Sequence, residues 1–314
     1  MQDLLLLAHK YDDHKHKKNF KLTDYLLSQK LEGMRAFWDG GCTKNMKISQ
    51  VPWANLTVDR SVNDRLSTGL WTRLGRPIFC PEYFTEKFPK CPLDGELYLG
   101  VNTFQKLMSL VKPFEANNSD WNGVSYCVFD SPNWVIFTEK RKLPWGRMGD
   151  VFFGPELNTS YSYFEDVWNK FLLPNVLECE NPYIAPLHQH ELSGEADLDY
   201  YMSQVFNQGG EGVMLRHRRS FWLPKRSKDI LKVKFKDDDE ALVVDIQPGE
   251  GQCAGRIGSL IVNWQGKVFN IGTGFTLEER LLLMNTIIGK TVKFSYRGLT
   301  EEGIPKEARF VGVL

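Results

Sequence analysis

Residues 30–35 read Lys-Leu-Glu-Gly-Met-Arg and place a lysine, an acid and an arginine close together. A lysine amine is a nucleophile only when it is neutral, and burial or neighbouring cations favour that form. Glu32 and Arg35 are suited to position a ribose and a phosphate beside Lys30, and Gly33 allows the sharp backbone path that this requires. On its own, the pattern is more typical of a solvated turn with an ion pair, so the rest of the chain must decide.

Two further acids alternate along a predicted strand. Residues 93–100 read Leu-Asp-Gly-Glu-Leu-Tyr-Leu-Gly. Because successive side chains of a strand point to opposite faces, Asp94 and Glu96 share one face. Paired carboxylates suit Mg²⁺ or ribose hydroxyls, although the edge of a surface strand explains the pair equally well in isolation.

Two later strands are predicted to carry charges of opposite sign. Glu211 opens a strand over residues 211–216, while Lys232 and Lys234 project from one face of a strand over residues 230–235. Burying two lysines side by side is costly unless anions meet them. A triphosphate or a DNA strand would meet them, whereas an exposed edge strand is the usual explanation of an isolated Lys-x-Lys pattern.

The charge of the chain is balanced in total but not in distribution. The 314 residues contain 39 Lys and Arg and 39 Asp and Glu. Residues 216–236, here called the basic strip, hold nine Lys and Arg but one acid, whereas residues 155–211 hold ten acids and one base. The basic strip is a candidate phosphate-binding face, and a solvated surface is the alternative.

Cysteine spacing and hydropathy indicate the environment of the protein. The six cysteines include no Cys-x-x-Cys pair, which argues against a zinc ribbon or a disulfide scaffold and favours a cytoplasmic or other reducing compartment. No apolar run reaches about 18 residues, so we expect no membrane span. Residues 4–8 are apolar but too short for a signal sequence.

Apolar spacing predicts the main helices and strands. Helical periodicity over residues 104–111, 164–172 and 198–206 is explained by core packing, and residues 124–130 read as a buried strand that includes Phe129. The four acids at residues 237–240 mark an abrupt change of charge and are a candidate hinge.

The last part of the chain, after residue 240, is predicted to consist mainly of short strands. Five short strands are predicted there, together with one helix that begins with a capping box formed by Thr276 and Glu279. The helix is expected to end at Gly289 and to present an apolar stripe of Leu277, Leu281, Met284 and Ile288. Five strands and one helix in about 75 residues suit a small barrel of the oligonucleotide-binding (OB) type.

Taken in order, these stretches resemble the motif set of the covalent nucleotidyltransferases, and most closely the compact two-domain ATP-dependent DNA ligases of bacteria and viruses. The resemblance covers the whole chain. It implies an α+β fold, with a nucleotidyltransferase (adenylation) domain of antiparallel sheets and flanking helices over residues 1–237 and an OB-fold barrel over residues 238–314. The stretches that carry it are residues 30–35, 93–96, 128–130, 211–212 and 231–234, with residues 255–275 and 296–311 in the barrel.

The resemblance also implies an activity. Lys30 would attack the α-phosphate of ATP, in the presence of Mg²⁺ or Mn²⁺, to form a lysyl-AMP and release pyrophosphate. The AMP would pass to the 5′-phosphate of nicked duplex DNA, and the 3′-hydroxyl would then displace it. Cations that stabilise the phosphoryl transition state are the main physical demand. We expect the enzyme to work as a monomer.

The resemblance assigns further roles, residue by residue. Glu96 and Glu211 would serve Mg²⁺, Asp94 would join them at the ribose and the metal, and Phe129 would stack on adenine. The nucleotide-binding set implied is Gln29, Lys30, Glu32, Arg35, Arg73, Glu96, Phe129, Glu211, Lys232, Lys234 and Arg309, and the catalytic set is Lys30, Arg35, Asp94, Glu96, Glu211, Lys232 and Lys234.

Two features depart from the family pattern. Position 32 is usually Asp in these ligases, and Glu32 is one methylene longer, which puts its contacts in doubt. The turn between Gly258 and Gly274 is too short for the long hairpin with which some viral ligases clasp duplex DNA. We also expect no separate DNA-binding domain before Lys30. We therefore expect the basic strip and the basic segment of residues 9–21 to hold the DNA.

Three alternatives share the same residues. An RNA ligase or an RNA–DNA strand-joining enzyme would use the same core, but the barrel favours DNA. A capping guanylyltransferase would require a preference for GTP. A non-catalytic nucleic-acid-binding module is disfavoured by the presence of Lys30, Glu211, Lys232 and Lys234.

Overall fold

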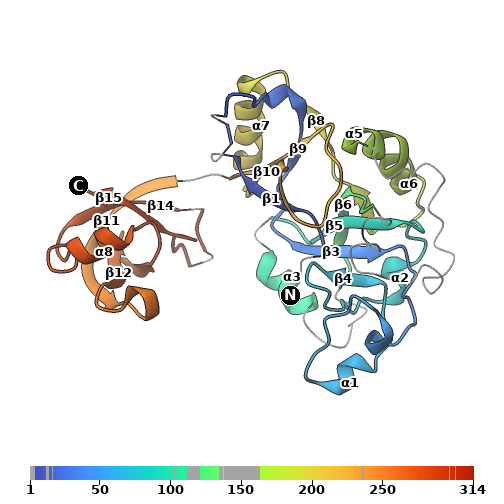
Figure 1. Ribbon diagram of the computed structural model, residues 1–314, viewed down its shortest axis with the longest axis horizontal. Coiled ribbons are helices and arrows are strands. Elements are labelled where there is room, and N and C mark those ends of the chain that lie inside the picture. Colours follow the sequence, from blue (N-terminus) through green and yellow to red (C-terminus); the bar gives the residue numbers. More distant parts are fainter. Residues whose placement is uncertain are drawn as a thin grey trace. The chain divides into compact units, whose positions relative to one another are not determined.

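The computed structural model of the chain divides into two compact units, residues 1–233 and 234–314, which are described separately (Figure 1). The residues that it describes are 4–11, 14–15, 17–101, 103–111, 121–133, 137, 163–234, 237–296, 298–300 and 302–314. Within them, no helix is long and apolar enough to cross a membrane.

The first sheet of the N-terminal unit has the strand order β1-β10-β9-β2-β8. Strands β1 and β10 are parallel, whereas β2 is antiparallel to both β9 and β8. Helix α7 (Glu195–Asn207) packs against β9. The strands are β1 (Leu7–Lys10), β10 (Arg226–Lys234), β9 (Gly212–His217), β2 (Tyr25–Gln29) and β8 (His190–Glu191).

The second sheet of this unit has the order β4-β3-β5-β6-β7. Its pairs are antiparallel except for β6 and β7, which run parallel. The strands are β4 (Leu70–Thr72), β3 (Met34–Asp39), β5 (Pro92–Tyr98), β6 (Ser125–Asp130) and β7 (Ile184–Pro186). The helices of the unit, besides α7, are α1 (Arg60–Asn63), α2 (Glu82–Thr85), α3 (Phe104–Val111), α5 (Phe164–Asp166), a π-helical turn (Val167–Leu172) and α6 (Leu173–Leu177).

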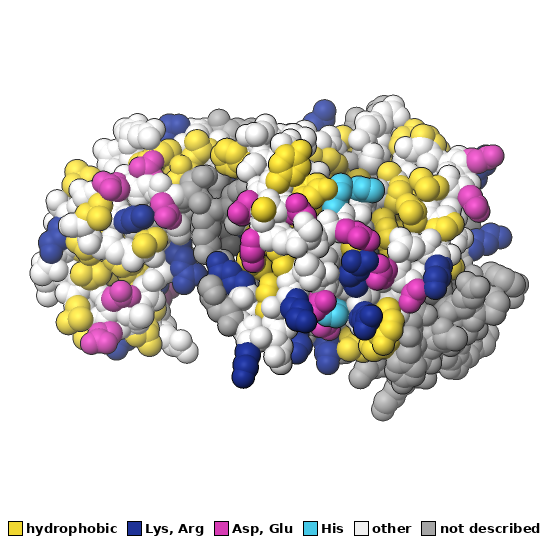
Figure 2. Space-filling view, turned by 90° about the horizontal axis from the view of Figure 1, so that it is seen from above, with side chains coloured by type: hydrophobic (Ala, Val, Ile, Leu, Met, Phe, Trp, Pro, Cys, Tyr) yellow, Lys and Arg dark blue, Asp and Glu magenta, His cyan; other side chains and the backbone are white. Residues whose placement is uncertain are grey.

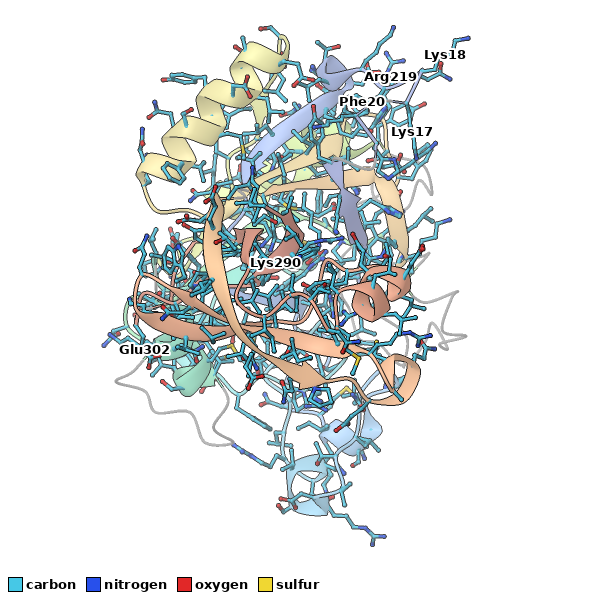
Figure 3. All side chains as sticks on the ribbon, turned by 90° about the vertical axis from the view of Figure 1, so that its left-hand side faces the viewer. Lys17, Lys18, Phe20, Arg219, Lys290 and Glu302 are labelled. Atoms are coloured by element: carbon cyan, nitrogen blue, oxygen red, sulfur yellow. The ribbon has the colours of Figure 1, made fainter. Side chains whose placement is uncertain are left out.

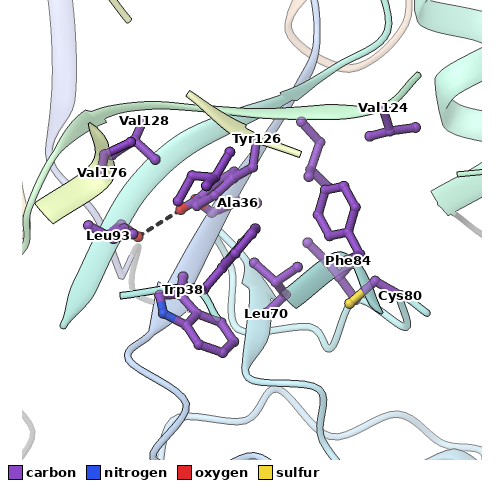
Figure 4. Packing of buried hydrophobic residues seen from close by; sticks show 14 of the residues in the cluster. Ala36, Trp38, Leu70, Cys80, Phe84, Leu93, Val124, Tyr126, Val128 and Val176 are labelled. Atoms are coloured by element: carbon purple, nitrogen blue, oxygen red, sulfur yellow. Dashed lines mark hydrogen bonds between the residues drawn. The ribbon is translucent and has the colours of Figure 1, made fainter. Parts of the chain in front are cut away.

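Two hydrophobic cores hold this unit together. The first lies on one face of the second sheet, where Trp38, Tyr126 and Phe84 are buried, and the Tyr126 hydroxyl points at the carbonyl oxygens of Ala36 (3.0 Å) and Leu93 (2.9 Å) (Figure 4). The second core contains the apolar start of the chain: Leu4, Leu5 and Leu6 are buried there with Phe37, Trp71 and Trp222.

A buried acid anchors the end of β3. Asp39 accepts hydrogen bonds from Trp71 Nε1 and from the backbone N–H of Gly41, both at 2.9 Å, and from Thr43 Oγ1. Burial raises the pKa of Asp39 to about 6, although these hydrogen bonds oppose the rise. The β3 strand is thereby fixed at the end remote from Arg35.

The five strands expected in the C-terminal unit form one antiparallel sheet, in the order β13-β12-β11-β14-β15. The named strands do not close into a barrel, and a single bridge between Thr273 and Arg309 joins the two edges. Gly274 permits this approach, because a Cβ there would lie 2.2 Å from the carbonyl oxygen of Phe310. The strands are β11 (Asp237–Pro248), β12 (Ile257–Trp264), β13 (Lys267–Ile271), β14 (Thr291–Tyr296) and β15 (Arg309–Val313).

The helix of this unit begins as predicted but presents another face. The capping box of Thr276 and Glu279 is confirmed, whereas α8 (Leu277–Leu282) ends well before Gly289. Arg280 turns inward and donates to three backbone carbonyls, those of Ile257, Gly258 and Gly272. The predicted apolar stripe is therefore wrong for Leu277, Leu281 and Ile288, which are exposed. Its fourth member, Met284, packs against the core beside the buried Ile287.

The acids at residues 237–240 are not a hinge. They form the beginning of β11 and pair with β14 from Tyr296 to Lys293, and Asp239 accepts a hydrogen bond from Trp264 Nε1 at 2.8 Å. A paired strand has no freedom to swivel within itself. The expected change of charge is real, but it marks the first strand of the C-terminal unit.

Candidate active site

Lys30 lies directly after β2, at the point where the chain leaves the first sheet. Its backbone N–H donates to the carbonyl oxygen of Gly212 at 2.8 Å, and Gln29 pairs with Val213. This register sets Lys30 beside Glu211, and Lys30 Nζ forms an ion pair with Glu211 Oε2. The two side chains are 22% and 21% exposed, so a ligand can still reach them.

Gly33 lets the loop after Lys30 run against β5. A Cβ at this position would lie 2.2 Å from the carbonyl oxygen of Leu97 and 2.7 Å from Glu96 Cγ. Any other residue would have to push the loop away, so glycine is required by the close approach. The loop thereby carries Lys30 and Glu32 over the strand that holds Glu96.

Arg35 and Asp94 form a bidentate ion pair between β3 and β5. Arg35 Nε donates to Asp94 Oδ1 at 2.9 Å and Nη2 donates to Oδ2 at 2.5 Å. Burial alone would lower the pKa of Arg35, but the charge and hydrogen bonds of Asp94 raise it above its usual value. Asp94 is fully buried, so in this structure it holds Arg35; its expected role at the ribose or metal remains a prediction.

Glu96 faces the Lys30–Glu211 pair. The pKa of Glu96 is raised to about 7, mainly by burial; Arg35 and Lys30 oppose this rise, and Asp94 and Glu211 add to it. No group of three or more metal-binding side chains occurs in the described part of the chain. Mg²⁺ commonly binds one or two carboxylates together with substrate phosphates, and Glu96 with Glu211 fits that arrangement.

Phe129 lies on the face of β6 that is turned away from the first core. Its neighbours Val128 and Asp130 are buried, whereas Phe129 is half-buried. The Arg35 guanidinium is 5.4 Å from its ring centroid, a cation–π distance. Phe129 therefore lies beside the Arg35–Asp94 pair, and its stacking on adenine remains a prediction.

The remaining predicted residues lie further along the strands. Lys232 and Lys234 are half-buried on one face of β10, and Lys232 pairs with Lys10 of β1. Arg73 is exposed after β4, and Arg309 is exposed on β15 of the C-terminal unit. The structure thus brings together Lys30, Arg35, Asp94, Glu96, Phe129 and Glu211, whereas Glu32 lies near Tyr98.

Sequence reasoning missed one buried ion pair. Arg216 of β9 and Asp130 of β6 join the two sheets, with Arg216 Nη2 at 3.2 Å from Asp130 Oδ2 and both side chains almost fully buried. Asp130 in turn is paired in register with Asp94. The available signal was a charged residue at the last position of each of the two predicted strands, residues 124–130 and 211–216.

The basic residues of the N-terminal segment collect at one end of the first sheet. Lys17, Lys18, Phe20 and Arg219 lie at the same corner of the molecule (Figure 3), and the three cations are exposed. A ring contact anchors the segment to β2, since the ring centroids of Phe20 and Tyr25 are 5.3 Å apart. On the face shown in Figure 2, Lys and Arg side chains are interspersed with Asp and Glu side chains, so this face as a whole is not a positively charged surface.

Comparison with known proteins identifies relatives over the whole chain. Residues 248–313 match the family model of the DNA ligase OB-like domain. The DNA ligase of Haemophilus influenzae is 27% identical over 306 residues, which cover 98% of this chain and 90% of that protein.

Solved structures agree with these matches. A Lig E DNA ligase, from a group described as binding DNA with a minimal scaffold, has a TM-score of 0.73 and 29% identity, with all of both chains covered. Pmar-Lig_PreS3 has a TM-score of 0.67 and 18% identity over 98% of this chain and 67% of its own, a likeness of fold alone. The α+β fold with a C-terminal OB-like domain is thereby confirmed.

Proposed function

We propose that this chain, a homologue of DNA ligases along its whole length, uses ATP to seal nicks between a 3′-hydroxyl and a 5′-phosphate in duplex DNA. The observation that carries the proposal is the convergence of Lys30, Glu211, Glu96 and the Arg35–Asp94 pair at one place. A nucleophilic amine, two carboxylates and a fixed guanidinium are the groups that nucleotidyl transfer through lysine needs.

In the first step, Lys30 Nζ forms a bond to the α-phosphorus of ATP, and the bond from that phosphorus to the bridging oxygen of pyrophosphate breaks. The amine must be neutral to attack, and its Nζ lies against Glu211 Oε2. Glu211 is the nearest acceptor for the amine proton, while Lys232 and Lys234 offer positive charge to the phosphates. Glu32 and Gln29 border the site and would contact the nucleotide.

The carboxylates of Glu96 and Glu211 would hold Mg²⁺ or Mn²⁺ against the phosphates. When bound, such an ion neutralises charge that develops on the phosphate oxygens. Glu96 can do this only in its ionised form, and its pKa of about 7 places that form in balance with the acid near neutral pH.

The later steps transfer AMP to DNA and join the strands. The 5′-phosphate oxygen of the nick displaces Lys30 from the AMP phosphorus, and the 3′-hydroxyl oxygen then displaces AMP from the nick phosphorus. Arg35 and Arg73 would orient these phosphates. Because Asp94 takes two donors of Arg35, the guanidinium keeps a fixed plane while its other N–H groups face substrate.

We place duplex DNA on the basic end of the first sheet, where the N-terminal segment meets the basic strip. Lys17, Lys18 and Arg219 are exposed there, and β1 is hydrogen-bonded to β10 of the strip. Phosphate contacts of this kind supply affinity without reading sequence. A monomer would suffice, since one chain carries both the reactive lysine and the DNA-binding cations.

Incubation with α-labelled ATP and Mg²⁺, followed by denaturing electrophoresis, tests the proposal. We expect a labelled protein band with wild type and with Lys87→Ala, whose lysine pairs with Glu180 on the surface, and no band with Lys30→Ala. Labelling of the Lys30→Ala protein would refute the assignment. Nicked DNA should then be sealed faster than nicked RNA, and a preference for RNA would indicate an RNA ligase.

A further inference from the structure

We propose that Arg216 is a positioning residue for the ligase reaction: through Asp130, it keeps the Asp94 carboxylate in its bidentate ion pair with Arg35. The inference rests on the proposed function, because it concerns the guanidinium that would meet the nucleotide and nick phosphates. It assigns a role to a charged pair that lies below the site and has no place in the nucleotide contacts described above.

The four residues form a row between the two sheets, in which two neighbouring acids are flanked by one arginine on each side. Arg216 of β9 pairs with Asp130 at 3.2 Å, Asp130 lies beside Asp94 in the β5–β6 register, and Asp94 pairs with Arg35. The charge of each acid is felt by both arginines. The geometry of Arg35 therefore depends on how the negative charge is shared along this row.

Stability alone does not explain Arg216. Its Nε, Nη1 and Nη2 atoms are buried and make no hydrogen bond within the described part of the chain. It also lies over the Phe164 ring, whose centroid is 4.9 Å from the guanidinium carbon. A buried charge with so few hydrogen bonds costs free energy that an apolar residue would not, so a role in organising the site is the better explanation.

Removing Arg216 changes the balance at Arg35. Asp130 would be left as a buried carboxylate next to Asp94, and Arg35 would be the cation that still acts on it. Asp229 of β10, the further acid that acts on Arg216, would also lose that partner. Asp130 would then draw Arg35 away from its bidentate geometry. Removing Asp130 instead would leave Arg216 free to compete with Arg35 for Asp94.

The test compares Arg216→Gln, Asp130→Asn and the double change in single-turnover formation of Lys30–AMP. Each single change should lower the rate constant at saturating ATP by about tenfold, with the half-saturating ATP concentration and the fraction of protein that reacts unchanged. The double change removes both charges and should restore the rate. Arg216→Lys keeps the positive charge and should also recover most of it.

Other outcomes would overturn the proposal. A normal rate constant with a smaller reacting fraction would mean that Arg216 serves folding alone, and a raised half-saturating ATP concentration would mean direct contact with ATP. If Arg216→Gln does not fold, Asp130→Asn serves as the test, and a normal rate of Lys30–AMP formation in that variant would refute the proposal. Absence of Lys30–AMP in wild type would instead reject the proposed function, so the two failures are distinguishable.

Discussion

Lys30 and Glu211 form an ion pair although 181 positions separate them in the chain. The pairing of β2 with β9 brings them together, because Gln29 lies opposite Val213 and the two residues stand just beyond those positions. The reactive amine is thus held against a carboxylate at the point where the chain leaves the first sheet. ATP binding must disturb this pair before the amine can attack phosphorus.

Glu211→Gln should slow formation of Lys30–AMP by about 10²-fold or more, because the change removes both the proton acceptor and a metal-binding carboxylate. The matched control is Glu191→Gln, which breaks the surface pair with Arg218 and should leave the rate unchanged. Labelled ATP and rapid quenching give both rates. Equal rates for the two variants would place Glu211 outside the reaction.

Gly33→Ala should reduce adenylylation of Lys30 while the protein stays folded. The new methyl would meet the Leu97 carbonyl oxygen at 2.2 Å, so the loop must move, and a displacement of about 1 Å at a reacting group costs on the order of 10²-fold in rate. Gly194→Ala is the control, because a Cβ there meets nothing within 4 Å. Similar activity in both variants would show that the loop has room.

The sequence predicted the strands that carry the site better than it predicted their partners. Alternation along residues 93–100 correctly placed Asp94 and Glu96 on one strand, and β5 confirms it. Which cation each acid meets depends on register between β3 and β5, and no local pattern encodes register. The Arg35–Asp94 pair and the Arg216–Asp130 pair therefore emerged only from the structure.

The C-terminal unit shows a second limit of sequence patterns. Spacing predicted five strands and a capped helix, all of which occur. It misassigned the buried face of that helix, because Arg280 donates to backbone carbonyls of Ile257 and Gly258 in β12 and of Gly272, just after β13. An arginine drawn inward by such contacts overrides apolar periodicity, and the leucines at positions 277 and 281 face solvent.

The stability of the N-terminal unit should depend on pH through Asp39. The unfolded chain has a pKa of about 3.9 for Asp, and burial raises it to about 6 in the folded protein. Between these values the folded state holds a proton that the unfolded state has lost, so the contribution of Asp39 falls as pH rises from about 4 to about 7. Asn cannot titrate.

Urea unfolding at both ends of that pH range measures the effect. The free energy of unfolding of wild type minus that of Asp39→Asn should decrease by about 2 kcal/mol between about pH 4 and about pH 7. Asp64→Asn, at an exposed position, should show no such trend. A difference that is constant with pH would mean that Asp39 titrates normally.

Nick binding should be steeply salt-dependent, with a log–log slope of roughly −0.9 for each phosphate contacted. The double change Lys18→Ala, Arg219→Ala removes two exposed cations of the basic corner (Figure 3) and should flatten that slope by about 2. Lys106→Ala on α3, also exposed, should not. Identical slopes for the three proteins would locate the DNA elsewhere.

Arg309→Ala tests whether the C-terminal unit takes part in the first chemical step. Arg309 is exposed on β15, where its strand pairs with Ser295 and bridges to Thr273. Its backbone is therefore fixed by neighbours on both sides, while its side chain is available to a ligand. The resemblance to ATP-dependent DNA ligases implies that a basic residue late in this domain orients the leaving pyrophosphate, and we expect Arg309 to do so here.

If Arg309 orients pyrophosphate, its loss should slow formation of Lys30–AMP by about 10²-fold or more. The same protein should still seal a nick that already carries a 5′-AMP, because pyrophosphate has left before that step. Lys290→Ala, which removes an exposed cation elsewhere on the C-terminal unit, is the matched control. Equal loss in both reactions would indicate DNA binding or folding, and normal adenylylation would leave Arg309 without a role in pyrophosphate release.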